Sequence, residues 1–126
     1  DRIDDVAIVK LAYWDLVRTE TLERLFPNGY PGIDLEHASL LETSMMLLVR
    51  PDLVEVEKIP DDGPGRFPPF ERFPEPVGYL PPSGVLARAD GSSAEKGQWL
   101  MDDHVTLMTN AIREAFKLPL TQEIST

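Results

Sequence analysis

The 126-residue sequence predicts a single domain of the α/β class. An apolar run over residues 6–17 suits a strand that is buried on both faces of a parallel sheet, and two later segments have helical patterns. An apolar fraction of 42% and a charged fraction of 27% are typical of a globular protein with its own core. We therefore expect helices packed on a mostly parallel sheet.

The charge balance excludes some classes of partner. Acidic residues outnumber basic ones by 22 to 12, and a net charge of -10 disfavours binding to nucleic acid or to an anionic membrane. The absence of cysteine excludes disulfides, thiolate catalysis and cysteine-based zinc sites. The sequence has neither a long apolar run nor the features of a signal peptide at residues 1–5, so we expect a cytoplasmic protein.

The first expected element is the strand over residues 6–17, which reads VAIVKLAYWDLV. An antiparallel or edge strand is the alternative, since few residues precede this run. A short helix over residues 21–26 should follow and end at the turn Pro27-Asn28-Gly29.

A second helix is expected over residues 35–49, with Asp34 in the N-cap position and Pro51 just beyond the end. Its sequence, LEHASLLETSMMLLV, is apolar on nearly every face. This pattern predicts a helix that other structure encloses.

Residues 60–85 form the segment richest in proline, and they also contain Phe67, Phe70, Phe73 and Tyr79. Disorder is one interpretation, but disordered segments are poor in aromatic residues. We therefore expect an ordered, extended loop that is pinned by its phenylalanine and tyrosine side chains.

The last element is an amphipathic helix over residues 92–117. Ser92 and Glu95 have the spacing of a capping box, and Pro119 closes the helix. Apolar residues recur at helical intervals, namely Met101, Val105, Met108, Ile112, Ala115 and Phe116. The simplest role of this helix is packing against the sheet.

The chain has two histidines, and their spacing does not predict a histidine-based metal site. His104 follows Asp102 and Asp103, but consecutive residues of a helix point in different directions. We therefore expect His104 to be a partly buried structural residue.

His37 and Glu42 are the candidate catalytic residues. If Asp34 caps the second helix, His37 lies in its first turn, where the helix dipole keeps the imidazole neutral, as a general base or a metal ligand requires. A histidine satisfied by neighbouring backbone is an equal alternative. Glu42 is costly to bury unless it is paired or ligating. It lies about 140° around a regular helix from His37, so we expect it to hold backbone amides or a neighbouring cation, unless His37 precedes the regular helix.

Residues 36–44, EHASLLETS, resemble the H-A-G-x-x-E-T-S signature of the creatininase (creatinine amidohydrolase) family, with Ser39 where many members have glycine. The similarity continues through MMLLVRPDLV at residues 45–54. It includes PSGVL at residues 82–86 and EKG at residues 95–97, in the family's order.

This resemblance implies a three-layer α/β sandwich and an enzyme that hydrolyses a C–N bond of a small cyclic or linear amide such as creatinine. Members bind two divalent ions, Zn or Mn, whose bound hydroxide attacks the amide carbon, and they assemble into homohexamers. By resemblance, His37 transfers a proton to the leaving nitrogen, Glu42 lies in or beside the same pocket, and Tyr13 and Trp14 bind the substrate.

The sequence departs from the family in its metal ligands, because the family's E-x-H and N-G-H motifs are absent. We therefore expect residues 1–126 to represent the C-terminal half of one creatininase-like domain, as a fragment, a nicked product or a split subunit. The metal ligands would come mainly from a companion N-terminal half, and the chain alone would be inactive. The alternative is a noncatalytic α/β subunit or scaffold that uses the loop over residues 60–85 for assembly.

Overall fold

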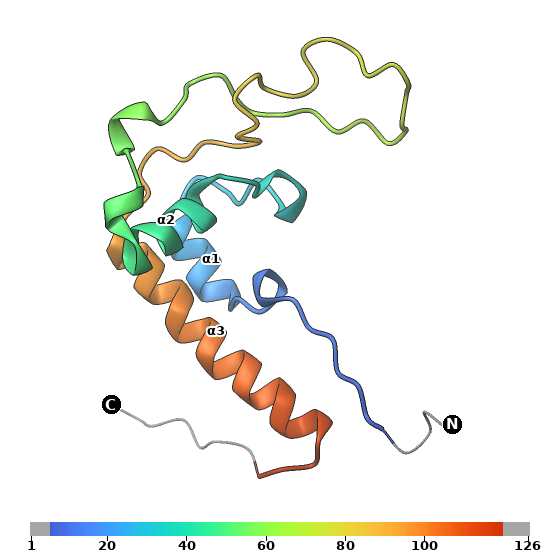
Figure 1. Cartoon of the computed structure of the whole chain (residues 1–126), viewed down its shortest axis with the longest axis vertical. Helices are drawn as coiled ribbons and strands as arrows, with labels where there is room; N and C mark the ends of the chain where they lie inside the picture. The colour runs from blue at the N-terminus through green and yellow to red at the C-terminus, as the bar shows by residue number, and fades with distance from the viewer. Residues whose placement is uncertain (1–5, 120–126) are drawn as a thin grey trace.

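The computed structural model describes residues 6–119, in which the regular structure is helical. Its α-helices are α1 (Thr19–Leu25), α2 (Leu40–Val49) and α3 (Ala94–Ala115). Four single 3-10 turns accompany them: η2 (Tyr13–Asp15), η3 (Ile33–Leu35), η4 (Pro51–Leu53) and η5 (Val56–Lys58). Figure 1 shows α2 lying across the N-terminal part of α3, with α1 beside them. None of the described helices has the length and apolar character needed to cross a membrane.

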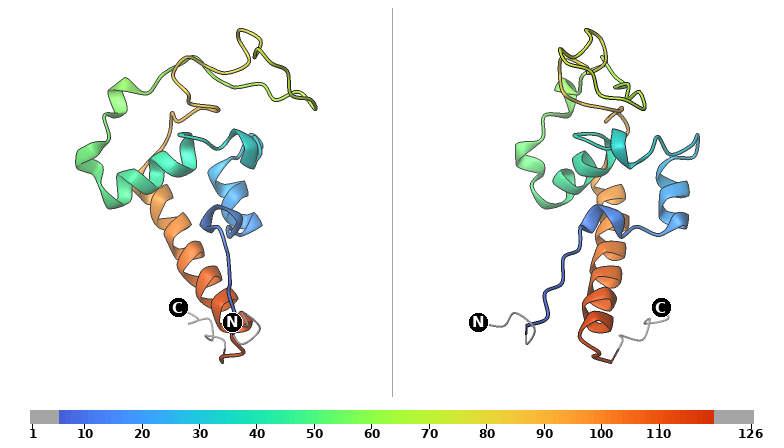
Figure 2. Two further views of the ribbon diagram at one scale, coloured as in Figure 1. Left: turned by 45° about the vertical axis from the view of Figure 1, so that its right-hand side comes forward. Right: turned by 90° about the vertical axis from the view of Figure 1, so that its right-hand side faces the viewer.

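The strand expected over residues 6–17 is not formed. Residues 6–12 are extended but pair with no strand among the described residues, and the chain then turns through η2. Val6 is 61% exposed and Ile8 80% exposed, and Figures 1 and 2 show this segment leaving the helices as a single extended chain. The prediction was wrong here because a strand requires a neighbour to satisfy its backbone, and residues 6–119 provide none. The sheet of the predicted α/β class is thus not seen in this range.

The short helix predicted at residues 21–26 is confirmed as α1, but the second helix begins later than predicted. Asp34 lies in η3, and α2 starts only at Leu40, because Ala38 has a positive φ of 54° that interrupts any helix. Ser39 occupies the N-cap position, and its buried hydroxyl donates to the carbonyl of His37 and accepts from the amide of Ala87. Only one face of α2 is enclosed by the described residues, since Met46 and Val49 are exposed.

The predicted C-terminal helix is confirmed as α3, with its cap shifted by one residue. The Ser93 hydroxyl accepts a hydrogen bond from the Lys96 amide at 3.2 Å, whereas the Ser92 hydroxyl donates to the carbonyl of Ala89. Asp103 of α3 then fixes the start of α1. Its buried carboxylate accepts from both the backbone amide (2.9 Å) and the guanidinium of Arg18, the N-cap residue of α1.

The core lies where α2 crosses α3, and it consists of Leu25, Leu40, Leu41 and Leu100. Gly97 makes this crossing possible. A Cβ atom at Gly97 would lie 2.2 Å from the carbonyl oxygen of Ser44, so only glycine lets the two backbones approach this closely. The buried Ser44 hydroxyl also accepts from the amide of Ser93 at the start of α3.

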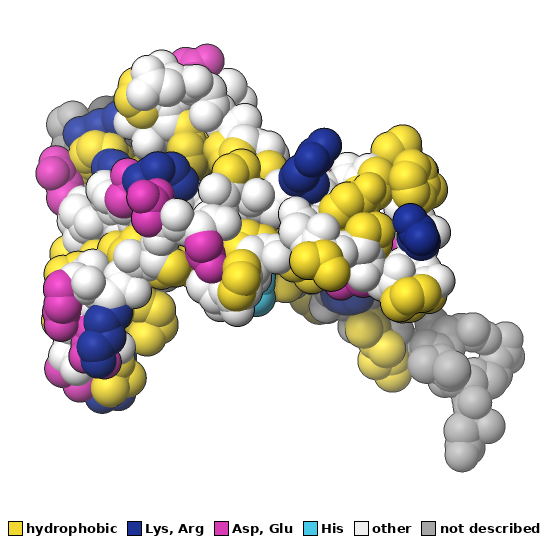
Figure 3. Space-filling model, turned by 90° about the horizontal axis from the view of Figure 1, so that it is seen from above, with side chains coloured by type: hydrophobic (Ala, Val, Ile, Leu, Met, Phe, Trp, Pro, Cys, Tyr) yellow, Lys and Arg dark blue, Asp and Glu magenta, His cyan; other side chains and the backbone are white. Residues whose placement is uncertain are grey.

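The segment over residues 60–85, called here the proline loop, runs as an extended excursion above the helices, as predicted (Figure 1). Its base is tied by hydrogen bonds from the Gly65 amide to the Leu86 carbonyl and from the Arg66 amide to the Tyr79 carbonyl. The expectation that its phenylalanines pin it was wrong, because Phe67, Phe70 and Phe73 are all exposed. Figure 3 shows hydrophobic side chains gathered on this loop.

We predict that Gly97→Ala destabilises the protein by about 1–3 kcal/mol, although alanine is the better helix former by about 1 kcal/mol. The added methyl collides with the backbone of Ser44, which cannot move as a flexible side chain could. Urea unfolding measures the difference, with Gln98→Ala on the exposed neighbouring position as the control. A Gly97→Ala protein as stable as the wild type would contradict the close approach of α2 and α3.

Candidate active site

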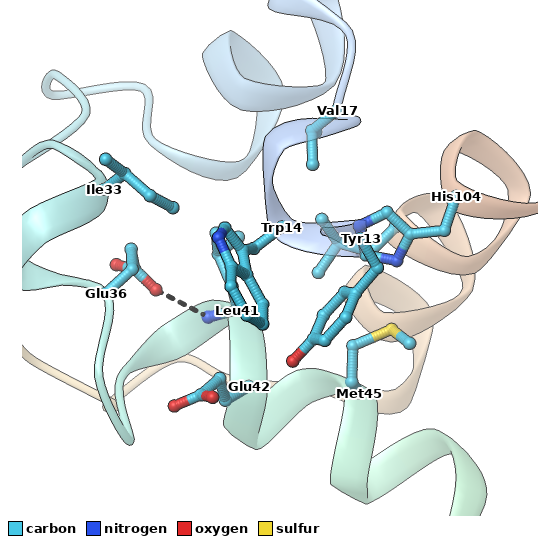
Figure 4. A pocket seen from close by; sticks show the side chains of 10 residues that line it. Tyr13, Trp14, Val17, Ile33, Glu36, Leu41, Glu42, Met45 and His104 are labelled. Carbon is cyan, nitrogen blue, oxygen red and sulfur yellow. Dashed lines mark hydrogen bonds between the residues drawn. The ribbon is translucent and has the colours of Figure 1, made fainter. Parts of the chain in front are cut away.

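A cavity of about 130 Å³ lies between η2, the segment preceding α2, α2 itself and α3. Its wall combines aromatic and aliphatic side chains with two carboxyl groups and one imidazole: Tyr13, Trp14, Val17, Ile33, Glu36, Leu41, Glu42, Met45, Leu100 and His104. Figure 4 shows these side chains converging from segments far apart in the sequence. We call this cavity the η2–α3 pocket.

Both residues expected to bind substrate line this pocket. Tyr13 and Trp14 come from η2 and meet edge to face, with ring centroids 5.2 Å apart. Partial burial raises the pKa of Tyr13, and the carboxylate of Glu42 raises it further, so the phenol stays protonated at neutral pH. The pair thus offers flat apolar surface together with a hydroxyl donor.

Glu42 lies in the first turn of α2, and its carboxylate accepts a hydrogen bond from the Ala38 amide at 2.5 Å. The same oxygen lies 4.0 Å from Nδ1 of His37. Glu42 therefore binds a backbone amide, which is one of the two supporting roles that we expected for it from the sequence.

His37 lies before α2 rather than in its first turn, so the expected effect of the helix dipole on it does not apply in that form. The side chain of His37 is 70% exposed and is not part of the pocket lining, but its Nδ1 lies 4.0 Å from the carboxylate of Glu42, which does line the pocket. The turn at Ala38 explains how the two can meet, because a regular helix through both residues would have pointed them apart.

Glu36 was missed by reasoning from the sequence. It is 9% exposed; one carboxylate oxygen accepts from the Leu41 amide at 3.1 Å, and the other, Oε1, has no hydrogen-bond partner among residues 6–119. Burial raises its pKa to about 7, and the charge of Glu42 adds to this while the bond from Leu41 opposes it. Glu42 was identified as an acid within an apolar stretch, and Glu36, which lies just before the same stretch, could have been examined on the same ground.

His104 is buried, as expected, but it also lines the pocket. It is 6% exposed, its ring meets that of Tyr13 edge to face with centroids 5.2 Å apart, and its Nε2 has no hydrogen-bond partner in the described part of the chain. Burial lowers the pKa of His104, and this effect is larger than that of the Asp103 charge, which raises the pKa. The imidazole is therefore neutral at pH 7. The neighbouring acids do point elsewhere: Asp103 binds Arg18, and Asp102 accepts from Gln98.

The described residues do not form a metal centre by themselves. Within residues 6–119, no three side chains of the histidine, cysteine, aspartate or glutamate type are grouped so that they could hold an ion. The chemistry that these residues offer is proton transfer and hydrogen bonding in a partly apolar pocket.

We predict that Glu36→Gln flattens the pH dependence of stability between about pH 4.5 and 7. The pKa of Glu36 is higher in the folded protein (about 7) than its ordinary value (4.5), so the folded state holds the extra proton in this window. The free energy of unfolding therefore falls as pH rises through it. Urea unfolding at several pH values measures the slope, with Glu57→Gln on the surface as the control. An unchanged slope in Glu36→Gln would contradict the buried, unpaired carboxyl.

Comparison with known proteins places the chain in a family. Residues 4–112 match the family model described as "Creatininase: Creatinine amidohydrolase". The chain is 39% identical over 115 residues to a creatinine amidohydrolase of Pseudomonas putida, and the match covers 90% of this chain and 44% of that protein.

Solved structures agree with the sequence comparison. A glutamate-to-glutamine mutant of creatininase complexed with creatine matches with a TM-score of 0.78 and 39% identity, over 83% of this chain and 42% of the other. A manganese creatininase matches with the same TM-score and identity, over 84% and 42%. The chain thus spans less than half the length of the relatives that it matches. The protein belongs to the creatininase family.

Proposed function

We propose that this chain forms part of a metal-dependent amidohydrolase of the creatininase type, which hydrolyses a C–N bond of a small cyclic or linear amide such as creatinine. Family membership supports an amidohydrolase. The observation that carries the proposal further is the position of His37, 4.0 Å from Glu42, which lines the same pocket as Tyr13 and Trp14.

In this proposal, His37 is the catalytic residue that transfers a proton to the leaving nitrogen. Its exposed ring can change protonation state without the cost of burying a charge. Glu42 acts as a positioning residue: the Ala38 amide fixes its carboxylate, which lies 4.0 Å from Nδ1 of His37 and orients the imidazole.

Tyr13 and Trp14 would bind the substrate. Their edge-to-face arrangement presents aromatic surface to a flat amide, and the Tyr13 hydroxyl can donate to its carbonyl oxygen. One structure that the chain resembles is of a mutant creatininase complexed with creatine, a small molecule of the proposed substrate class.

The divalent ions would be held by residues outside those described, since residues 6–119 provide no ligand cluster. Related structures are named for manganese and for a Zn-Zn site, and bound divalent ions supply hydroxide and polarise carbonyl groups in hydrolases. We propose that a companion segment, equivalent to the part of the relatives that this chain does not match, contributes the ligands. Without it the chain would be inactive.

The same companion would supply the missing sheet. Residues 6–12 are already extended, and the side chains of Val6, Ile8 and Val9 are exposed. A run that is apolar on both faces is what a central strand of a covered sheet requires. The three-layer α/β sandwich and the larger homo-oligomer would form only in the assembled protein.

A second candidate, a noncatalytic scaffold, is favoured by one observation. Phe67, Phe70 and Phe73 of the proline loop are exposed together, which suits contact with another protein. The two candidates differ in whether the assembled protein holds metal.

We predict that His37→Ala lowers turnover of creatinine by about 10²-fold or more in the protein assembled with its companion, as loss of a general acid or base does. Metal occupancy should stay unchanged, because His37 is not proposed as a ligand. Steady-state kinetics and metal analysis of the same samples test both points, with Glu57→Ala as a surface control. Loss of metal in His37→Ala would instead identify a ligand.

We also predict that the chain purified alone retains no stoichiometric divalent metal, and that the assembly retains two ions per copy. Elemental analysis after purification with added Zn or Mn measures the ratio. An assembly without metal under these conditions would contradict the enzyme and support the scaffold.

A further inference from the structure

The hydroxyl of Ser39 does not have the usual role of a serine at the start of a helix. An N-cap serine accepts a hydrogen bond from an amide in the first turn of its helix. Ser39 is fully buried at the N-cap position of α2, but in the described part of the chain its hydroxyl caps no amide of that helix. The first-turn amide of Leu41 is bound by Glu36 instead. The hydroxyl of Ser39 is therefore free to bind other groups.

The partners of this hydroxyl belong to two segments that are far apart in the sequence. Oγ of Ser39 accepts a hydrogen bond from the amide of Ala87, 48 residues further along the chain, at 3.0 Å. Its hydrogen is donated to the carbonyl oxygens of His37, at 3.0 Å, and Leu35, at 3.1 Å. One buried hydroxyl thus connects the turn before α2 to the residues that follow the proline loop.

The same connection fixes the backbone of His37. The carbonyl oxygen of His37 accepts from the Leu86 amide at 3.1 Å as well as from Ser39, so both of its lone pairs are used. The next residue, Ala38, has a positive φ of 54°, which a residue other than glycine keeps only where its surroundings enforce it. The side chain of His37 is itself 70% exposed. The imidazole is therefore located through its backbone and not by burial of the ring.

We propose that Ser39 is a positioning residue for His37. Its hydroxyl connects the turn at residues 37–39 to residues 86–87 and thereby determines where the imidazole lies beside Glu42. This inference rests on the proposed function, because it takes His37 as the residue that transfers the proton. Without the hydroxyl, a buried backbone amide loses its acceptor, and the two segments are free to separate.

The experiment removes the hydroxyl with Ser39→Ala and uses Ser44→Ala as the matched control. Ser44 is equally buried in the same helix region, and its hydroxyl also accepts from a backbone amide. By NMR of the full chain, we expect Ser39→Ala to shift the imidazole signals of His37. Hydrogen exchange of the Ala87 amide should become about 10-fold faster or more, because this amide has lost its acceptor. Ser44→Ala should leave both observables as in the wild type.

Kinetics of the protein assembled with its companion give a second measurement. We expect Ser39→Ala to lower kcat for creatinine by about 10-fold with KM nearly unchanged, because a misplaced proton donor slows the chemical step without removing contacts to the substrate. Ser44→Ala should keep kcat within about 2-fold of the wild type. Ser39→Gly repeats both measurements, since glycine is tolerated at an N-cap almost as well as serine, and it keeps the test valid if Ser39→Ala does not fold.

A purely structural Ser39 gives different results. The proposal is overturned if the variants without the hydroxyl keep the wild-type imidazole signals of His37, or if Ser39→Ala and Ser44→Ala lose kcat equally. A His37→Ala protein that has lost turnover, beside a Ser39→Ala protein with the wild-type kcat, overturns this inference alone and leaves the proposed function standing. Unchanged turnover in His37→Ala would overturn the proposed function instead.

Discussion

The backbone contact between α2 and α3 at Ser44 and Gly97 is the constraint on which the rest of the structure depends. It fixes where α2 crosses α3, and this crossing brings Glu36, just before α2, and Glu42, in its first turn, into one pocket with His104 of α3. It also gives a physical reason for the glycine of the EKG segment, where any side chain would meet the carbonyl of Ser44. A residue outside the pocket lining thereby determines the geometry of the pocket.

The start of α2 concentrates the chemistry of the chain. Glu36 and Glu42 each accept a hydrogen bond from a backbone amide there, from Leu41 and Ala38 respectively. The positive end of a helix dipole favours negative charge, so the first turn of α2 helps to hold the carboxylate of Glu42. Glu36 lies before the helix, and burial raises its pKa to about 7. The turn at Ala38 that delays the helix is also what brings His37 next to Glu42.

The sequence predicted the helices whose ends depend on local signals. The predictions were wrong for features that depend on contacts between residues far apart in the sequence. The period of α3 and its nearby proline located that helix within two residues at each end, and the turn after residue 26 located α1. The positive φ of Ala38 has no local signature, so the start of α2 was placed too early. The prediction of a strand over residues 6–17 was wrong because a strand forms only beside a neighbouring strand, and the described residues contain none. His104 was expected to be buried, but its place in a pocket depends on Tyr13, from the other end of the sequence.

We propose, as the central claim, that this chain supplies the residue that transfers the proton in an amidohydrolase. The metal ligands of that enzyme would come from a companion segment. The most direct measurement mixes the chain with the portion of the Pseudomonas putida creatinine amidohydrolase that it does not match, adds Zn or Mn, and follows creatinine hydrolysis. The account predicts turnover by the mixture and none by either part alone. Complex formation with bound metal but without hydrolysis would contradict it.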